Sequence, residues 1–344
     1  LFIYSGIASL LPVWLLLQPR DYINSHQLLV GLGLIFIGLF IAQPIVDAPM
    51  IRVSGAGVPN MFPLLFVTIA CGAISGFHGL VSSGTTSKQV IDIRDTKLIG
   101  YGAMLGEGTL ALAATIAAIA GISLVTNCNL PAVGMVEDLS WAVYYDSWAH
   151  AAANKATAFV LGGGALIEFL GIPSNLAKTI MAVLVISFAA TTLDTATRIQ
   201  RFILMEVGDS LKIKVLKNRY IATIIAIIPA LCLTIWDVTD PATGSSTQAG
   251  WVLWPIFGAS NQMLAALILM TLSIYFWKRN RPVLPLVIPF IFITIITLTT
   301  LVEKAQSFAM TNRLLLVIDG ILIALILWML YEGWMVFRAR LHSK

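Results

Sequence analysis

Hydrophobic side chains along this chain gather into ten continuous runs, and polar side chains lie mainly between them. Most runs approach the length of about 20 residues that a helix needs to cross the hydrocarbon core of a bilayer. The runs are continuous rather than alternating, which favours membrane-spanning helices and excludes a transmembrane barrel. The predicted segments are 1–17, 28–46, 62–82, 98–125, 157–171, 175–198, 219–236, 252–277, 283–302 and 314–337.

The weakest of these segments, 157–171, is predicted not to cross the membrane. Three consecutive glycines, Gly162, Gly163 and Gly164, stand at its centre, and glycine is a poor helix former. The preceding stretch carries aromatic residues of the kind that gather at membrane interfaces, namely Trp141, Tyr144, Tyr145 and Trp148. We therefore expect 126–174 to form one extracytoplasmic, lid-like insertion with a helical hairpin that dips into the protein, and about nine transmembrane helices to remain.

The positions of lysine and arginine predict the orientation, because these residues concentrate in cytoplasmic loops. With nine spans, 16 of the 21 basic residues fall on the cytoplasmic side, among them Arg20, the basic loop 199–218 and the C-terminal tail. The remaining five are Arg52, Lys155, Lys178, Lys304 and Arg313. The sequence thus predicts a multi-pass protein of the inner (plasma) membrane whose C-terminus is cytoplasmic.

Composition supports this fold class and excludes several others. Hydrophobic residues make up 58% of the chain, charged residues only 11%, and the mean hydropathy is +0.89. A soluble domain, a disordered tail and a disulfide scaffold all have different compositions. The net charge of +4 is explained by cytoplasmic loops, so we expect the lipid bilayer and no nucleic acid as a partner.

Two further expectations come from the cysteines and from the first residue. Cys71, Cys128 and Cys232 lie in three separate segments without metal-ligand spacing, so neither a zinc site nor a disulfide framework is predicted. The chain begins at Leu1, inside an apolar run. We therefore interpret residues 1–344 as a single all-α integral membrane domain, the C-terminal part of a longer membrane protein whose N-terminal segment is missing.

Glycines and hydroxyl residues interrupt the predicted span 62–82 and continue to Lys88. This pattern predicts a helix break between Gly72 and Gly84, since broken helices at membrane depth expose backbone groups that bind substrates or ions. The alternative is a small-residue helix whose glycines pack against a neighbour. The candidate substrate-binding residues are Ser75, Gly76, Phe77, His78, Ser82 and Ser83, the first four facing a central cavity.

A second polar stretch lies at the end of segment 175–198. Thr191, Thr192 and Thr195 gather three hydroxyls on neighbouring positions of one helix, and hydroxyl oxygens are suitable ligands for a hard cation such as sodium. Asp194 precedes Arg198 by four residues, the spacing of a helical ion pair. The alternative is that Asp194 only pairs with Arg198 while the threonines bond back to their own helix.

Other polar residues lie inside apolar segments. Asn261 and Gln262 are candidates for substrate binding, although amides at such depth also hold neighbouring helices together. Glu107, between two glycines, is an intramembrane acid and a candidate for ion coupling. Asp319 is a weaker candidate of the same kind, nearer its helix end. In a proton-coupled protein, the coupling role would shift from the threonines to Glu107, His78 or Asp194.

These stretches resemble the carbon starvation protein A (CstA) family of membrane transporters. The resemblance covers most of the chain and excludes only the last two spans, which are generic. Its motifs are residues 11–22, 71–87, 99–105, 191–198 and 254–262, including Thr191-Thr-Leu-Asp-Thr-Ala-Thr-Arg198 and Trp254-Pro-Ile-Phe-Gly-Ala-Ser-Asn-Gln262.

The resemblance implies a secondary transporter of the amino acid–polyamine–organocation superfamily with a LeuT-like inverted-repeat fold. Peptide uptake on carbon starvation and proton-coupled pyruvate uptake are the activities attributed to its members. By this analogy, 62–82 is the second broken helix, 126–174 the outer lid, and 175–198 the helix that carries the sodium site of sodium-coupled relatives. The first broken helix lies in the missing N-terminal segment.

We therefore expect a secondary active transporter that imports a small nutrient, a peptide or a pyruvate-like carboxylate, coupled to a proton or sodium gradient. The alternative is a membrane-embedded nutrient sensor or interaction subunit without transport. An enzyme is not predicted, because no HExxH, GxSxG or paired-carboxylate motif occurs. No cofactor is expected.

Overall fold

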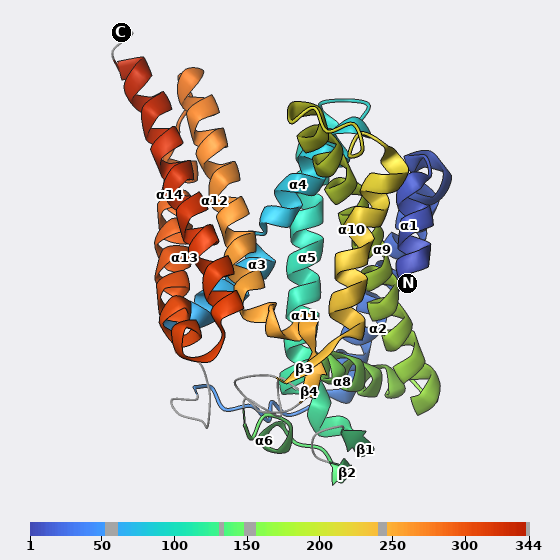
Figure 1. The fold of residues 1–344 in the computed structure, drawn as a ribbon. Helices are drawn as coiled ribbons and strands as arrows, with labels where there is room; N and C mark the ends of the chain where they lie inside the picture. Colours follow the sequence, from blue (N-terminus) through green and yellow to red (C-terminus); the bar gives the residue numbers. More distant parts are fainter. Residues whose placement is uncertain (52–60, 131–133, 148–155, 240–245, 342–344) are drawn as a thin grey trace. The chain divides into compact units, whose positions relative to one another are not determined.

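The computed structural model describes residues 1–51, 61–130, 134–147, 156–239 and 246–341, and these residues are mostly helical (Figure 1). The chain divides into two compact units: Leu1–Val58 with Val90–Thr223, and Pro59–Gln89 with Ile224–Lys344. Each unit is therefore assembled from two separate stretches of sequence. The expectations for Arg52, Trp148, Lys155 and Lys344 lie outside the described residues.

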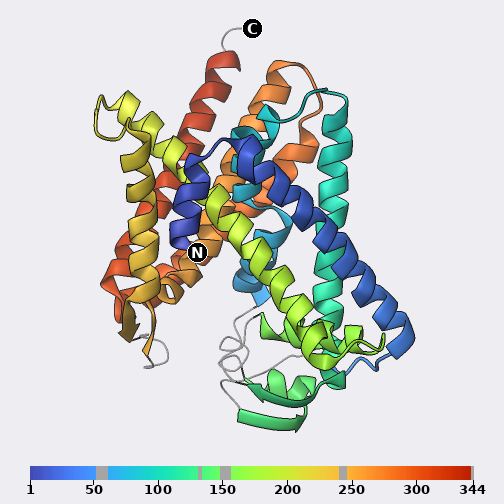
Figure 2. The same ribbon diagram turned by 90° about the vertical axis from the view of Figure 1, so that its right-hand side faces the viewer.

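The first unit is mainly helical and contains one β-hairpin. Its elements are α1 (Phe2–Leu10), α2 (Val13–Ala42), α5 (Asp95–Ile119), the 3-10 turn η3 (Gly121–Leu124), β1 (Thr126–Leu130), β2 (Gly134–Asp138), α6 (Trp141–Tyr144), α8 (Thr157–Glu168) and α9 (Ser174–Ser210). Helices α2 and α9 lie side by side, and β1 and β2 lie at one end of the unit (Figure 2). Because α9 continues to Ser210, the first residues of the predicted loop 199–218 are helical.

The predicted boundary between the first two spans, 1–17 and 28–46, is wrong. The structure breaks the chain at Leu11 and Pro12, where Leu11 is extended (φ −72°, ψ 154°), and α2 then runs without interruption through the polar stretch that was predicted as a loop. Proline lacks an N–H and disfavours helical geometry in the residue before it, which accounts for the position of the break. Arg20 is therefore a helical residue of α2, not a loop residue.

The glycine triplet in α8 serves close packing. Gly162, Gly163 and Gly164 are buried, and a Cβ atom at Gly162 would overlap the carbonyl group of Ala117 in α5. In the same way, a Cβ at Gly38 of α2 would overlap the Leu166 carbonyl of α8. At 12 residues, α8 spans about 18 Å, well below the roughly 30 Å of a bilayer core.

The helical hairpin expected within 126–174 stays a prediction, because residues 131–133 and 148–155 of this segment lie outside the described residues. In the described part, an antiparallel β-hairpin comes first, in which Thr126 pairs with Asp138 and Leu130 with Gly134. The short helix α6 and then α8 follow. Buried side chains of this region, including Leu130 and Tyr144, form one apolar cluster with Ile122 of η3.

The second unit centres on three long helices. Its elements are η1 (Met61–Leu65), α3 (Phe66–Ala73), α4 (Gly76–Gly84), η2 (Thr86–Lys88), β3 (Asp237–Thr239), β4 (Ser246–Gln248), α11 (Ala249–Val252), α12 (Trp254–Lys278), α13 (Leu284–Thr311) and α14 (Arg313–Leu341). Helix α10 (Arg219–Ile235) begins in the first unit and continues into the second, because the boundary falls between Thr223 and Ile224. Figure 1 shows α12, α13 and α14 beside one another, and their core includes Ala266, Leu301 and Ile326.

Six helices in the described part of the chain are long and apolar enough to cross a membrane: Val13–Ala42, Asp95–Ile119, Ser174–Ser210, Ile256–Lys278, Leu284–Met310 and Arg313–Ala339. This supports a helical membrane protein, whereas nine spans are not confirmed. The predicted span 219–236 corresponds to α10, which at 17 residues is short. The predicted span 62–82 is divided into α3 and α4, so the predicted helix break is confirmed.

The glycine contact between α2 and α8 generates a matched test. Gly38→Ala should lower the free energy of unfolding by about 1–3 kcal/mol, because the added methyl group must push the Leu166 backbone away. Gly33→Ala on the same helix meets no atom within 4 Å and should be neutral or stabilising. Thermal unfolding of both variants in detergent checks this. Equal effects would mean that α2 and α8 do not touch at Gly38.

Candidate functional site

The break between α1 and α2 leaves backbone carbonyl groups without helical partners, and two arginines of α9 bind them. Arg198 donates from its two Nη atoms to the carbonyl oxygens of Ala8 (2.7 Å) and Leu11 (2.9 Å). Arg201 donates to the carbonyl oxygen of Ser9 at 2.7 Å. Positive charge at a helix C-terminus is favourable, so the arginines cap α1 and fasten it to α9.

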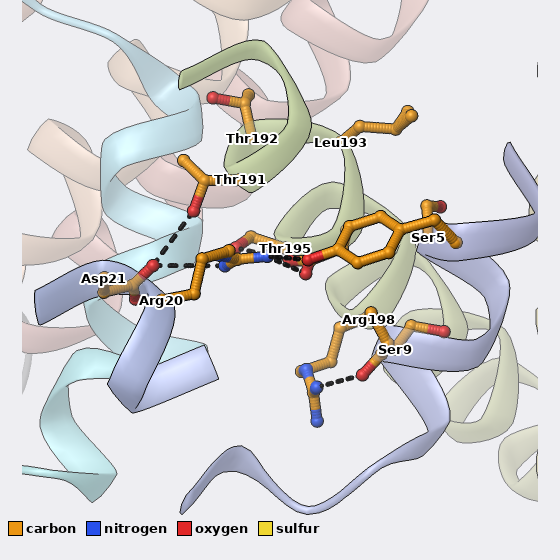
Figure 3. A network of polar contacts seen from close by, with 12 residues as sticks. Ser5, Ser9, Arg20, Asp21, Thr191, Thr192, Leu193, Thr195 and Arg198 are labelled. Atoms are coloured by element: carbon orange, nitrogen blue, oxygen red, sulfur yellow. Dashed lines mark hydrogen bonds and ion pairs between the residues drawn. The ribbon is translucent and has the colours of Figure 1, made fainter. Parts of the chain in front are cut away.

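A third arginine pairs with the aspartate of the predicted coupling motif. The Arg20 guanidinium of α2 forms an ion pair with Asp194, whose side chain is only 1% exposed, and it also contacts Asp21 at 3.1 Å. Figure 3 shows Arg20 beside Asp21. The alternative interpretation, in which Asp194 only pairs with Arg198, is wrong, because Arg198 bonds to the end of α1.

The three threonine hydroxyls do not donate to one point. Thr191 donates to Asp21 Oδ1 at 2.9 Å, and Thr195 donates to Asp194 Oδ1 at 3.3 Å (Figure 3). Thr192 is exposed and donates to the Phe188 carbonyl of its own helix at 2.8 Å. Two of the threonines therefore orient carboxylates, while the third forms the back-bond of the alternative interpretation.

This cluster, which we call the α2–α9 polar network, is defined by Arg20, Asp21, Thr191, Asp194 and Thr195. The Arg20 guanidinium and the Asp194 carboxylate are withdrawn from solvent, where electrostatic attraction is stronger than in water, whereas Asp21 is exposed. A hydrogen bond of 2.9 Å between the hydroxyls of Ser5 and Thr197 links α1 to α9 nearby. The network joins carboxylates on two different helices through one guanidinium.

A second candidate site lies in the other unit, at the break between α3 and α4. Ser75 is extended (φ −88°, ψ 130°), and its hydroxyl caps α4 by accepting the Phe77 N–H at 3.2 Å. Asn261 of α12 also accepts this N–H, at 3.0 Å, and its amide lies 3.1–3.2 Å from the Ser75 hydroxyl. Asn261 therefore holds α4 and α12 together, as interhelical amides do.

The glycines after the break pack closely on α12, as the alternative interpretation of this stretch predicted. A Cβ at Gly76 would overlap the Leu264 side chain and the Asn261 carbonyl, and a Cβ at Gly79 would overlap Ile268. The stretch is therefore both a broken helix and a small-residue packing face. We name Ser75, Gly76, Phe77 and Asn261 the α4 N-terminal site.

The remaining predicted site residues are not brought into these two clusters. Ser82 and Ser83 are exposed and donate to the Gly79 and Leu80 carbonyls of their own helix. His78 and Glu107 are exposed, on α4 and α5. Gln262 is 1% exposed in the α12 helix, and in the described part of the chain neither amide atom of its side chain has a hydrogen-bond partner.

Sequence reasoning missed Arg20, Asp21 and Arg201 as site residues. Arg20 and Arg201 were counted as loop charges, although the Arg20–Asp21 pair follows directly on an apolar run, and Arg201 follows Arg198 at the spacing of one helical face. Within the described residues, no group of three His, Cys, Asp or Glu side chains could hold a metal ion. Cys128 and Cys232 are free thiols, and burial raises the pKa of Cys128.

Comparisons with known proteins agree with the resemblance seen in the sequence. The family described as carbon starvation protein CstA matches residues 1–300. The peptide transporter CstA of Helicobacter pylori (strain J99) is 32% identical over 315 residues, which cover 81% of this chain and 45% of that protein.

Two proteins of Escherichia coli (strain K12) are similar to the same extent. The peptide transporter CstA is 31% identical over 88% of this chain and 49% of its own length, and the pyruvate/proton symporter BtsT is 32% identical over 88% and 50%. The chain thus spans about half the length of these curated relatives. No solved structure matches it.

The α2–α9 polar network predicts a strong dependence of stability on Arg20. Arg20→Gln leaves Asp194 as an uncompensated buried charge, which costs about 3–5 kcal/mol and should lower the melting temperature of the purified protein. Arg94→Gln, at an exposed arginine, should leave the melting temperature unchanged.

The double variant Arg20→Gln with Asp194→Asn separates charge from packing. It removes both members of the pair, so part of the lost stability should return. A double variant no more stable than Arg20→Gln alone would contradict the ion pair as the source of the effect.

Proposed function

This chain belongs to the carbon starvation protein CstA family, and from that premise we propose that it is part of a secondary active transporter that imports a small nutrient bearing a carboxylate. Candidate substrates are short peptides and pyruvate-like acids, since relatives are named a peptide transporter and a pyruvate/proton symporter. The proposal places the protein in the inner membrane with its C-terminus in the cytoplasm.

The observation that carries this proposal is the α3–α4 break. A helix that begins inside the bilayer presents unpaired N–H groups and the positive end of its dipole, and both attract anions. Transporters with interrupted helices bind substrate carboxylates at such helix ends. In α4 the first turn contains no acidic residue that would oppose an anion.

The residues of the α4 N-terminal site fit a carboxylate. The Ser75 hydroxyl and the Asn261 amide carry donor hydrogens beside the Phe77 N–H, and Gly76 adds no side chain of its own. The substrate would take the place that the Asn261 carbonyl oxygen now holds on the Phe77 N–H. Asn261 would then offer its amide hydrogens to the carboxylate, so the same residue serves the empty and the occupied site.

For coupling, the described contacts support a proton rather than sodium. Thr191 and Thr195 already donate to carboxylates, and Thr192 donates to the Phe188 carbonyl of its own helix. The Arg20 guanidinium would repel a metal cation at the same place, whereas protonation of Asp194 would release Arg20 from the pair. Asp194 is therefore the proposed proton acceptor, with Asp21 as the second partner of Arg20.

The alternative function is a nutrient sensor that binds the same acid without moving it. Both functions use the α4 N-terminal site, so binding alone does not separate them. Uptake of labelled pyruvate and labelled dipeptide into proteoliposomes, beside equilibrium binding of the same compounds, does. Binding without uptake would replace the transporter with the sensor.

Carboxylate recognition predicts a preference that competition measures. Pyruvate should compete with the labelled substrate about 10–100-fold better than pyruvamide, because a charge-assisted hydrogen bond contributes about 1.5–3 kcal/mol. Ser75→Ala should reduce this preference, whereas Thr271→Ala, at an exposed α12 hydroxyl that donates to Leu267, should not. Equal competition by acid and amide would refute the site.

Proton coupling predicts which gradient drives uptake. Uptake should depend on the pH gradient at fixed sodium and not on sodium at fixed pH, and Asp194→Asn should lower the pH-driven component at least about tenfold. Thr192→Ala and Glu107→Gln should retain it. A sodium dependence that Thr192→Ala abolishes would instead establish the threonine site for a cation.

A further inference from the structure

A buried carboxylate outside both candidate sites lies in the second unit. Asp319, in the second turn of α14, is 0% exposed, and neither of its carboxylate oxygens has a hydrogen-bond partner among the residues that the structure describes. An ionised carboxylate withdrawn from water without a partner is one of the most unfavourable groups that a fold can contain. Its position therefore needs a chemical explanation.

The packing of α12, α13 and α14 places three polar side chains at a similar depth. Ile256, Phe308 and Leu315 share one apolar cluster, which fixes the antiparallel register of the three helices. Counting 1.5 Å per residue from that level puts Asp319 and Lys304 both about 6 Å along the bundle, and Gln262 about 9 Å along it. The side chain of Gln262 is also buried with unpartnered amide atoms.

The ammonium group of Lys304, in α13, is close enough to Asp319 to interact with its carboxyl group electrostatically. The neighbouring residue Glu303 is exposed and interacts electrostatically with Lys304. The other charged residues of these helices are Arg313 at the start of α14, Glu332, Arg338 and Arg340 toward its other end, and Lys278 at the far end of α12. The elements η1, α3 and α11, which pack against α12 or α13, carry no charged residue, and α4, which also packs against α12, carries the titratable His78.

A metal ion does not fit this place. A hard cation needs several oxygen ligands, while Asp319 offers one carboxylate, Gln262 offers one amide oxygen, and the ammonium group of Lys304 repels a cation. A proton needs only the carboxylate. It removes the charge that burial disfavours, and its loss leaves a carboxylate that Lys304 can approach.

We propose that Asp319 is a proton-binding carboxyl group within the α12–α14 bundle, with Lys304 as the counter-ion of its deprotonated form. On protonation, one proton passes from solvent to a carboxylate oxygen and the Asp319–Lys304 attraction ends. On deprotonation the proton returns to solvent, and the Lys304 ammonium pairs with the carboxylate. The site is independent of the proposed function, because it requires neither substrate nor transport.

Infrared difference spectroscopy during a pH titration tests the proposal on the full-length protein in lipid vesicles. A protonated carboxyl group has its own C=O stretching band. The wild-type protein should show a titrating band that Asp319→Asn removes, while Glu303→Gln on the adjacent helix retains it. In the Lys304→Met variant, the band should persist until the proton concentration is about tenfold lower than in the wild type. The reason is that the variant lacks the ammonium group that favours ionisation of Asp319.

The outcomes are decisive in both directions. A band that persists unchanged in Asp319→Asn would overturn the proposal, as would a Lys304→Met variant that titrates like the wild type. Asp319→Asn mimics the neutral acid in shape and charge, so a variant that fails to fold would also contradict it. Because the readout is a spectrum without substrate, a failed transport assay leaves this result standing.

Discussion

Every interruption of a helix at membrane depth must find partners for the backbone groups that it releases, since lipid offers none. The two breaks in this chain meet that constraint by different means. At the end of α1, the guanidinium groups of Arg198 and Arg201 bind carbonyl oxygens. At the start of α4, Ser75 and Asn261 bind an N–H. Each unit is held together by a partner helix, α9 or α12, which supplies the missing hydrogen bonds.

The break at Ser75 was predictable because glycines and hydroxyls at membrane depth are a local signal, and the sequence shows them together. The break at Pro12 was not predicted, because apolar residues continue across it and the polar stretch that follows resembles a loop. That stretch is helical since Arg20 finds Asp194, a residue 174 positions away. Hydropathy records which side chains avoid water, and it does not record which charged side chains find one another.

The same limit explains the candidate sites. The sequence identifies Asn261 as a candidate from its depth in an apolar segment, and Asp194 from its motif. It does not identify their partners. Helix spacing favours Arg198 as the partner of Asp194, whereas in the structure Asp194 pairs with Arg20 and Arg198 binds a carbonyl oxygen of α1. Arginines counted as signs of a cytoplasmic loop instead hold the interior of a helical unit together.

Asn261 also sets a thermodynamic condition on whatever binds at α4. Its carbonyl oxygen already accepts a hydrogen bond from the Phe77 N–H, so this N–H is paired when no ligand is bound. A ligand that replaces it must first overcome about 1–2 kcal/mol of existing hydrogen bonding, which weakens its apparent affinity roughly 5–30-fold. This cost also favours selectivity, because water and weakly binding anions do not recover that free energy and therefore do not displace Asn261 from the Phe77 N–H. Selectivity at this site would then reside in the closed state of the empty protein as much as in the contacts of the occupied one.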